Sequence, residues 1–207
     1  MEKGLEEKYN DAIWVAKSLF DRKLVSGSAA NLSFRHGDKV YITRSGSIFG
    51  RLSVSDFATI DLEGNTLNCN RPSKEFPIHL LLYHKKKDIE AVIHVHSFYA
   101  TIWSCLQQAD EKDAIPAYTP YLGMQLGKIR LVEYHSPGSK ELFEAFENAL
   151  GETDGYILKN HGPIVGGTTI LDAFCKIEEL ETSAKAAWYL QGKKANLLVS
   201  PGKNTGH

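Results

Sequence analysis

Two histidines one residue apart give this sequence its clearest chemical signal. Ile93-His94-Val95-His96 ends an apolar run that favours a strand. Because alternate residues of a strand point to the same face, the imidazoles of His94 and His96 can reach one cation. Taken alone, the pair is equally typical of two partly exposed histidines at a strand end, so a metal site needs further ligands.

Two other segments supply candidate ligands. His161 lies in Lys159-Asn160-His161-Gly162-Pro163, a turn after a second predicted strand, where Gly162 permits tight backbone geometry. Glu75 stands near the predicted start of a helix, where an acid is often only a capping-box residue. Three neutral imidazoles would leave a cation its full charge and an open position, and a nearby carboxylate would act as acid and base. That combination suits the polarisation of a carbonyl group.

Small hydroxyl, amide and glycine residues recur in the loops of the first half of the chain. Backbone N–H groups at glycine turns and at helix N-termini bind phosphate well. Lys74 adds a positive charge that an ordinary helix cap does not need. Together these segments predict a phosphate pocket beside the metal: Ser26-Gly27-Ser28, Asn31, Thr43, Ser45-Gly46 and Ser73-Lys74.

The elements that must position these residues follow from periodicity and turn residues. Helices are predicted over 5–23, 76–87, 98–107, 140–150 and 170–191, and strands over 31–35, 39–43, 57–61, 91–96 and 155–159. Ser73 is the expected N-cap of the second helix, and Pro77 fits its first turn. The stretch 115–137 is expected to be a loop with one or two strands, and the tail after 192 to be mobile. Interleaved strands and helices predict one α/β domain over 1–207, a layered sandwich around a mostly antiparallel sheet.

The composition excludes several classes of protein. The 207 residues are 43% hydrophobic and 24% charged with a formal net charge of -1, which is ordinary for a globular chain and gives no basic face for nucleic acid. The first residues, MEKGLEEKYN, do not resemble a secretory signal, and no apolar stretch is long enough to span a bilayer. Cys69, Cys105 and Cys175 form no CxxC pair, so we expect reduced thiols in a cytoplasmic protein without a membrane partner.

The ordered motifs resemble the class II aldolase/adducin family over roughly residues 8–190. They are Asn31-Leu32-Ser33, Ile42-Thr43-Arg44-Ser45-Gly46, Pro72-Ser73-Lys74-Glu75, His94-x-His96 and Asn160-His161-Gly162. The resemblance implies a three-layer α/β/α sandwich, a homotetramer with active sites at subunit interfaces, and a Zn²⁺ site. It leaves Mn²⁺, Co²⁺ and Fe²⁺ open as the physiological metal. The implied metal ligands are Glu75, His94, His96 and His161, and the implied phosphate contacts are Asn31, Thr43, Gly46, Ser73 and Lys74. One position departs from the family, which usually has Gly where this chain has Ala30.

Softer motifs resemble the 3-oxo-tetronate 4-phosphate decarboxylase subgroup of that family. They are Ser73-Lys74-Glu75, Tyr118-Thr119-Pro120-Tyr121, the segment 127–138, Asn160-His161-Gly162-Pro163 and Glu178-Glu179-Leu180-Glu181-Thr182. The resemblance implies a metal-dependent lyase that converts a phosphorylated sugar acid to dihydroxyacetone phosphate and CO₂ through a metal-stabilised enediolate. Glu75 would protonate the enediolate carbon, and Tyr121 would be a proton donor, a substrate contact from a neighbouring subunit or an ordinary interface aromatic.

Three alternatives stay open from the sequence. The first is an aldolase or 4-epimerase that acts on a ketose phosphate of the fuculose or ribulose type. The second is methylthioribulose-phosphate dehydratase, and the third is a non-enzymatic adducin-like interaction module. The module is disfavoured because adducin head domains lack the metal histidines that this chain carries. Ser-His-Asp chemistry is a poor fit, since the sequence has no G-x-S-x-G elbow.

Overall fold

A seven-stranded sheet in the order β3-β2-β1-β4-β7-β6-β5 organises the protein. The computed structural model describes residues 2–107 and 110–198. Every neighbouring pair of strands is antiparallel except β5 and β6, which are parallel. The strands are β1 (Ala30–His36), β2 (Lys39–Thr43), β3 (Phe57–Asp61), β4 (Ala91–Val95), β5 (Arg130–Val132), β6 (Gly155–Leu158) and β7 (Gly162–Gly167). The predicted mostly antiparallel sheet is therefore confirmed.

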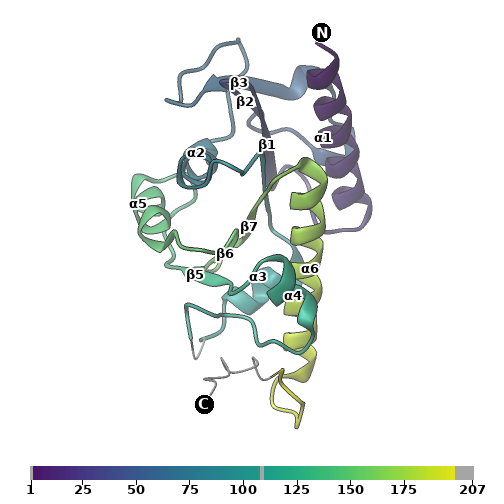
Figure 1. The fold of residues 1–207 in the computed structure, drawn as a ribbon, viewed down its shortest axis with the longest axis vertical. Coiled ribbons are helices and arrows are strands. Elements are labelled where there is room, and N and C mark those ends of the chain that lie inside the picture. Colours follow the sequence, from purple (N-terminus) through teal and green to yellow (C-terminus); the bar gives the residue numbers. More distant parts are fainter. Residues whose placement is uncertain (1, 108–109, 199–207) are drawn as a thin grey trace, which may run out of the picture.

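Helices cover both faces of this sheet. In Figure 1, α1, α3, α4 and α6 lie on one side, and α2 and α5 lie on the other. Each interface encloses its own apolar core. The helices are α1 (Lys3–Asp21), α2 (Phe76–Lys85), α3 (Phe98–Ser104), α4 (Pro120–Gln125), α5 (Lys140–Ala149) and α6 (Ile170–Leu190), with short 3₁₀ turns at Phe49–Arg51 and Val54–Asp56. The three-layer α/β/α sandwich is confirmed.

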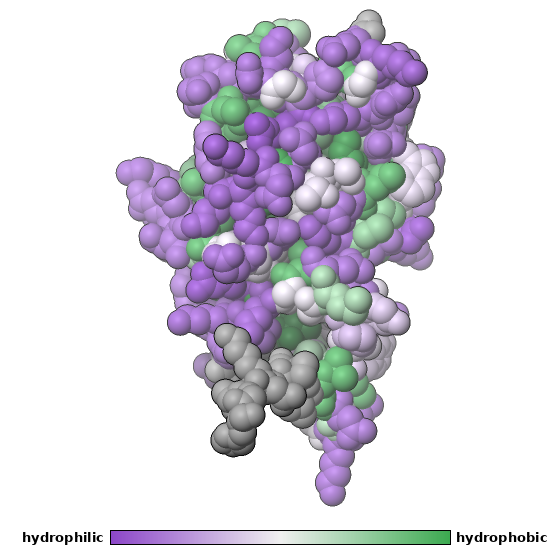
Figure 2. Space-filling view, viewed as in Figure 1, coloured by the Kyte–Doolittle hydropathy of each residue, from purple (hydrophilic) through white to green (hydrophobic). Residues whose placement is uncertain are grey.

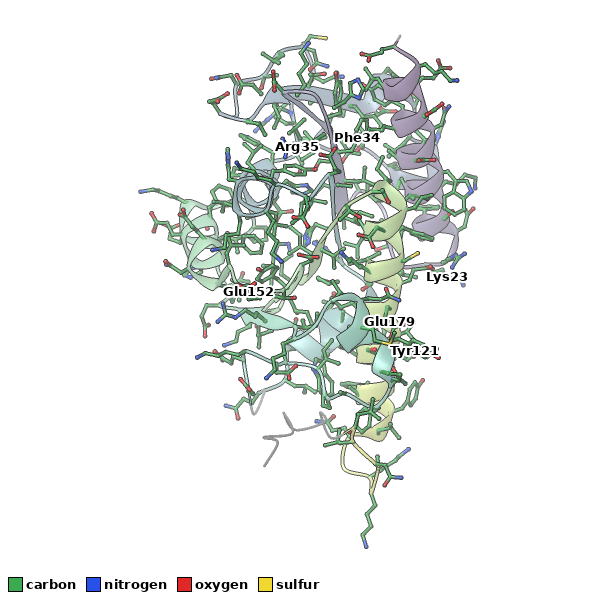
Figure 3. All side chains as sticks on the ribbon, viewed as in Figure 1. Lys23, Phe34, Arg35, Tyr121, Glu152 and Glu179 are labelled. Carbon is green, nitrogen blue, oxygen red and sulfur yellow. The ribbon has the colours of Figure 1, made fainter. Side chains whose placement is uncertain are left out.

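Period-two and helical patterns explain which face each element buries. Phe34 and Arg35 point to opposite sides of β1 in Figure 3, Phe34 toward α1 and Arg35 toward α2. Phe34 belongs to the core under α1, where it packs edge-on against Tyr9 with ring centroids 5.2 Å apart. The buried residues of α1 recur every three or four positions, which predicts one apolar face: Tyr9, Ala12, Val15, Ala16 and Leu19.

Two details of the predicted elements are wrong. The stretch 115–137 contains a helix, α4, as well as strand β5. The segment after His161 is strand β7 rather than a turn. Its sequence pattern did not indicate a strand because three of its six residues are glycine. An added Cβ at Gly167 would lie 2.4 Å from the backbone nitrogen of Ala173, so α6 can pack on β7 only with glycine there.

The start of α2 also differs from the prediction. Ser73 was the expected N-cap, but Glu75 occupies that position and makes no side-chain capping bond. Among the described residues, the one hydrogen bond that the Ser73 hydroxyl accepts comes from the Glu75 N–H, at 3.4 Å. Pro77 lies in the first turn as expected. Because Glu75 does not cap its own helix, its carboxylate is available to turn toward the histidines.

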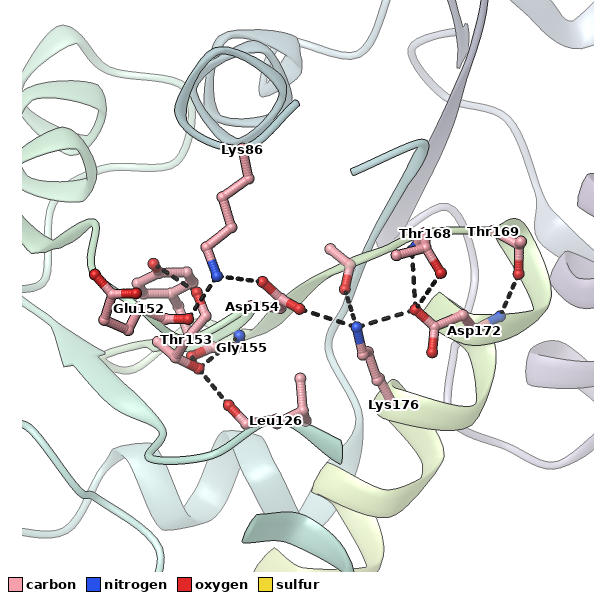
Figure 4. Close-up of polar contacts among 12 residues, drawn as sticks. Lys86, Leu126, Glu152, Thr153, Asp154, Gly155, Thr168, Thr169, Asp172 and Lys176 are labelled. Carbon is pink, nitrogen blue, oxygen red and sulfur yellow. Dashed lines mark hydrogen bonds and ion pairs between the residues drawn. The ribbon is translucent and has the colours of Figure 1, made fainter. Parts of the chain in front are cut away.

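A chain of ion pairs joins the end of α2 to β6 and α6 (Figure 4). Lys86, from the basic run after α2, lies 2.6 Å from Asp154, whose second oxygen is 3.0 Å from Lys176. Lys176 is buried and also lies 3.0 Å from Asp172. Burial alone would lower the pKa of Lys176, but the two carboxylates raise it above its ordinary value. These ion pairs therefore stabilise a charged lysine inside the fold and connect both helical layers to the sheet.

Three further expectations concern membrane spans, the cysteines and the C-terminal tail. In 2–107 and 110–198 no helix has the length and apolar character that crossing a membrane requires. Cys69, Cys105 and Cys175 are all free and exposed. Of the tail expected to be mobile, residues 199–207 lie outside the described part, and the Leu198 N–H donates to the Ala117 carbonyl.

Candidate metal centre

The first ligand candidate, His94, stands on the central strand of the sheet. It pairs with Asn31 of β1 on one side and with Ile164 of β7 on the other. Its side chain is fully buried, and its Nδ1 lies 2.9 Å from the Pro163 carbonyl oxygen. Since a carbonyl only accepts, Nδ1 carries the proton and donates. The neutral ring therefore turns the lone pair of Nε2 toward the site.

His96 and His161 complete a triangle with His94. The Nε2 atoms of His94 and His96 lie 3.2 Å apart. The ring centroids are 5.1 Å apart for His94 and His96, 4.9 Å for His94 and His161, and 4.8 Å for His96 and His161. One possible ligand atom from each ring lies within 4.8 Å of the others, so the cluster is able to hold a metal ion.

A three-residue hairpin loop brings His161 to the other two histidines. β6 ends at Leu158, which pairs with Gly162 at the start of β7. Asn160 takes the left-handed conformation with φ 53, which Asn tolerates better than most residues. An added Cβ at Gly162 would lie 2.4 Å from the Val95 carbonyl oxygen and 3.2 Å from the Cα of His96. Glycine at this position therefore lets the hairpin approach the end of β4 closely enough for the rings to meet.

Glu75 faces the triangle from the α2 side. Its Oε1 lies 3.3 Å from His161 Nε2, and its Oε2 lies 3.6 Å from His94 Nε2. Oε2 also accepts a 3.0 Å hydrogen bond from the Asn31 amide. Among the described residues, Glu75 Oε1 and both ring nitrogens of His161 are buried without a hydrogen-bond partner. Buried polar atoms without partners are costly, and a cation here would take the lone pairs of Glu75 Oε1 and of one His161 ring nitrogen.

Burial keeps the three imidazoles neutral in the metal-free protein. It lowers the pKa of His94 to about 3, and burial together with the neighbouring His94 lowers the pKa of His161 to about 3. Burial also lowers the pKa of His96, although Glu75 opposes the shift. Neutral imidazoles are the form that binds metal, so the donor set fits a divalent cation at neutral pH.

Metal-free protein should lose stability as the pH falls below 6.5. Burial lowers the pKa of both His79 and His94 to about 3, whereas an unfolded histidine titrates near 6.5. Between these values the unfolded state binds one more proton per histidine, so acid favours unfolding. Each residue should cost up to about 1.4 kcal/mol per pH unit in that window, and nothing above it. Urea unfolding of chelator-treated protein at pH 7.5, 6.5 and 5.5 measures this, and equal stabilities at the three values would contradict it.

A cavity of about 250 Å³ opens beside the triangle. It is lined by Ser28, Ala29, Ala30, Asn31, Arg44, Ser45, Gly46, Ser73, Lys74, Glu75, His96, Pro137 and His161. A larger hollow of about 520 Å³ lies elsewhere, around Asp110, Lys128 and Arg130, and contains none of the histidines. We place the candidate site in the smaller cavity because the unpartnered polar atoms converge there.

Four of the five expected phosphate contacts line this cavity, and one does not. Asn31, Gly46, Ser73 and Lys74 are at its wall. Thr43 is fully buried, and its hydroxyl accepts the Leu32 N–H at 3.1 Å. Its carbonyl accepts the Ser73 N–H, so Thr43 fastens the pocket loop to β2. The side chain of Thr43 is thus engaged inside the sheet.

Lys74 owes its position to a glycine far along the chain. An added Cβ at Gly138, which has φ 79, would lie 2.9 Å from the Lys74 Cδ. The loop that contains Pro137 and Gly138 therefore packs against the Lys74 stem. Lys74 is exposed and has no ion-pair partner in the part of the chain that the structure describes. Its ammonium is available to an anionic ligand.

Two other sequence expectations have a clear place in the structure. Tyr121 is 57% exposed on α4 and does not line the cavity (Figure 3). Within one chain it therefore does not join the site. Ala30, which stands where the family usually has Gly, begins β1 opposite Val95 and is not among the residues with positive φ. Alanine is consequently compatible with the backbone there.

The sequence interpretation missed the residues behind Glu75. Ser33, His79 and Tyr83 are buried in the wall between β1 and α2, and each makes side-chain hydrogen bonds there. A signal was present, because His79 and Tyr83 follow Glu75 at four-residue spacing and so share one helix face.

Comparison with known proteins agrees with this architecture. Residues 10–188 match the family described as Class II Aldolase and Adducin N-terminal domain. The chain is 40% identical over 188 residues to the 3-oxo-tetronate 4-phosphate decarboxylase of Haemophilus influenzae, covering 90% of each chain. It is 41% identical over 173 residues to the L-fuculose phosphate aldolase of Methanocaldococcus jannaschii, covering 84% of this chain and 91% of that one. The crystal structure of YgbL from Escherichia coli superimposes with a TM-score of 0.89 and 33% identity, covering 93% of both chains.

The fold and the histidine cluster thus define a metal-dependent lyase of the class II aldolase type. The chain belongs to the class II aldolase/adducin family. The predictions of that family and of a carbon–carbon lyase are confirmed by relatives that are decarboxylases and aldolases. Members of the aldolase class depend on a divalent metal, and the cluster of His94, His96 and His161 is able to bind one.

Proposed function

We propose that this protein decarboxylates a 3-oxo-tetronate 4-phosphate to dihydroxyacetone phosphate and CO₂. The observation that carries the proposal is the buried triangle of imidazoles with the unpartnered Glu75 Oε1, open to a small cavity that Lys74 borders. Similarity to the decarboxylase of Haemophilus influenzae supports the choice of reaction.

In this proposal His94, His96 and His161 hold the metal, which we take to be Zn²⁺ because neutral imidazoles are among its usual ligands. Mn²⁺, Co²⁺ and Fe²⁺ remain alternatives for the same donors. When bound, a divalent cation supplies the positive charge that polarises the keto oxygen of the substrate and stabilises the enediolate. Glu75 faces the cation in the absence of substrate and then works as acid and base.

In this proposal Glu75 supplies the proton that the reaction takes up. Loss of CO₂ breaks a carbon–carbon bond and leaves its electron pair on the substrate, which becomes an enediolate. The enediolate carbon takes up one proton, which Glu75 acquires from solvent through the cavity before the step and delivers through Oε1, the oxygen without a hydrogen-bond partner among the described residues. The burial of Glu75, which is 5% exposed, excludes bulk water from this proton transfer.

The anionic groups of the substrate would lie against the pocket loops. Gly46 has φ 78 at the turn after β2, a conformation that aims backbone N–H groups at a ligand. Ser73 and the Lys74 ammonium face the same cavity. Asn31 contributes its remaining amide hydrogen, since its other polar atoms are already engaged.

Assembly, domain organisation and location are further proposals. We propose a homotetramer, supported by apolar side chains that stay exposed on neighbouring helices: Phe98 is 63%, Tyr121 is 57% and Met124 is 77% exposed. The face viewed in Figure 2 is largely hydrophilic. In a tetramer, Tyr121 would reach the site of a neighbouring subunit. We also propose that the chain forms a single domain, since one sheet carries both cores, and that it is cytoplasmic, since its cysteines are free.

A substrate panel tests the reaction. Metal-loaded protein is incubated with 3-oxo-tetronate 4-phosphates and, separately, with ketose 1-phosphates, and CO₂ and aldehyde are measured. We expect CO₂ and dihydroxyacetone phosphate in equal amounts from the acid. Similarity to the fuculose phosphate aldolase makes aldol cleavage the second candidate. Aldehyde from a ketose phosphate, with no CO₂ from the acid, would establish the aldolase in its place.

A further inference from the structure

Two rows of side chains meet behind the candidate metal centre. The β1 row is Asn31, Ser33 and Arg35, and the α2 row is Glu75, His79 and Tyr83. Alternate strand residues repeat about every 6.6 Å and helix residues four apart about every 6 Å, so two such rows stay in step. As a result, each of the four inner side chains lies between two of the other row, and Glu75 and Arg35 stand at the ends.

The contacts run without interruption from the acid–base residue into the core. The Asn31 amide nitrogen lies 3.0 Å from Glu75 Oε2, and the Asn31 oxygen lies 2.5 Å from His79 Nε2. Ser33 Oγ lies 2.7 Å from His79 Nδ1 and 2.7 Å from the Tyr83 hydroxyl. Ser33 and His79 are fully buried, and Asn31 and Tyr83 are 4% and 2% exposed. The Arg35 guanidinium lies over the Tyr83 ring at 5.7 Å.

The carboxylate at one end and the neutral ring of His79 fix the direction of every hydrogen bond in this series. A carboxylate only accepts, so the Asn31 nitrogen faces Glu75 and the Asn31 oxygen faces His79. His79 must therefore donate from Nε2. Burial lowers the pKa of His79 to about 3, so the neutral ring leaves Nδ1 as an acceptor. The Ser33 hydroxyl then donates to Nδ1 and accepts from Tyr83, and every donor points toward Glu75.

The chain makes the two oxygens of Glu75 unequal. Oε2 accepts the Asn31 amide, while Oε1 has no hydrogen-bond partner among the described residues and faces His161. We propose that His79, supported by Ser33 and Tyr83, is a positioning residue that holds Glu75 through Asn31 and leaves Oε1 free for proton transfer. The role of Oε1 rests on the proposed function, whereas the orientation of the chain does not.

The tautomer of His79 tests the orientation without any turnover. Full-length protein labelled with ¹⁵N-histidine is measured by NMR, metal-free and with Zn²⁺, and the His79 signals are assigned by their loss in His79→Gln. We expect a protonated Nε2 and an unprotonated Nδ1 at neutral pH. Ser33→Ala should shift the Nδ1 resonance because it removes the donor to that atom. A His79 ring protonated on Nδ1, or on both nitrogens, would refute the proposed direction of these hydrogen bonds.

Kinetics with the substrate of the proposed function test the positioning role. His79→Leu should lower kcat about 10- to 100-fold, the range typical for partners of active-site groups, with KM and metal content little changed. Ser33→Ala and Tyr83→Phe should lower kcat by smaller factors. His79→Gln keeps a donor for Asn31 and should recover part of the loss. Unchanged KM and metal content in His79→Leu would show that the leucine variant is folded.

Tyr156→Phe is the matched control. Tyr156 is also fully buried, and its hydroxyl accepts the Gly151 N–H and donates to Thr153, away from the site. Its variant should keep full kcat although it loses a comparable hydrogen-bond donor. The positioning role is refuted if the His79 and Tyr83 variants keep full kcat like this control. It is also refuted if only their KM rises or only their metal content falls. If no substrate in the panel turns over, the proposed function fails, while the NMR result still decides the orientation.

Discussion

Replacing His96 with alanine should strip the bound metal and lower kcat/KM by about 10³-fold or more. The imidazole is one of three whose ligand atoms lie within 4.8 Å of one another. With two imidazoles left, the site has lost a third of its neutral donors and should release the cation. The reaction then loses the several kcal/mol of charge stabilisation that the bound cation supplies. His96 is the best of the three to replace, because it is only partly buried and its loss leaves a small cavity.

Metal content after gel filtration, measured by atomic spectroscopy, checks this result beside the steady-state rate. His84→Ala is the control, since His84 is an exposed histidine in the last turn of α2 whose Nε2 bonds to the Leu62 carbonyl. That variant should retain metal and rate. A His96→Ala protein with stoichiometric metal and full activity would refute the assignment of the metal centre.

Glu75→Gln should lower kcat by about 10²- to 10⁴-fold while the protein still binds metal. Glutamine has the length of glutamate, and its oxygen can still accept the Asn31 amide that now bonds to Oε2. It cannot carry the proton that the proposed step delivers. The magnitude is that of a lost general acid or base. The His96 and Glu75 variants therefore separate loss of the cation from loss of the proton donor.

The measurement for Glu75→Gln is single-turnover product formation at saturating substrate, together with metal content. Glu144→Gln serves as the control, because Glu144 lies on α5 in an exposed ion pair with Lys140 and should be neutral for catalysis. An unchanged kcat in Glu75→Gln would remove the residue from the chemical step. A fall in rate that matched a fall in metal content would make Glu75 a ligand only.

Glu75→Gln can keep its metal while it loses activity because Glu75 has neighbours on two sides. On one side it faces His94 and His161, at 3.6 and 3.3 Å. On the other side, Asn31 ties it to the buried chain that ends at Tyr83. The residue is thus held by the scaffold independently of the cation.

Local sequence patterns determined the elements and the face that each side chain takes. The apolar run before His94 predicted a strand, and period two then placed His94 and His96 on one side, because alternation is a property of the extended backbone. Periodicity likewise predicted the opening helix, strands β1, β2, β3, β4 and β6, and the helices other than α4, whereas β7 and α4 were not predicted. The ligand histidines could be identified from residue type and from the resemblance to a known family.

Only the tertiary structure decided which of these residues meet. β7 joins β4, and that pairing brings His161 to the two strand histidines through the close approach at Gly162. The same packing turned the Thr43 hydroxyl into the sheet and threaded His79 between Asn31 and Ser33. Contacts between distant segments depend on strand order and on how helices pack on the sheet, and periodicity within one segment carries no information about either.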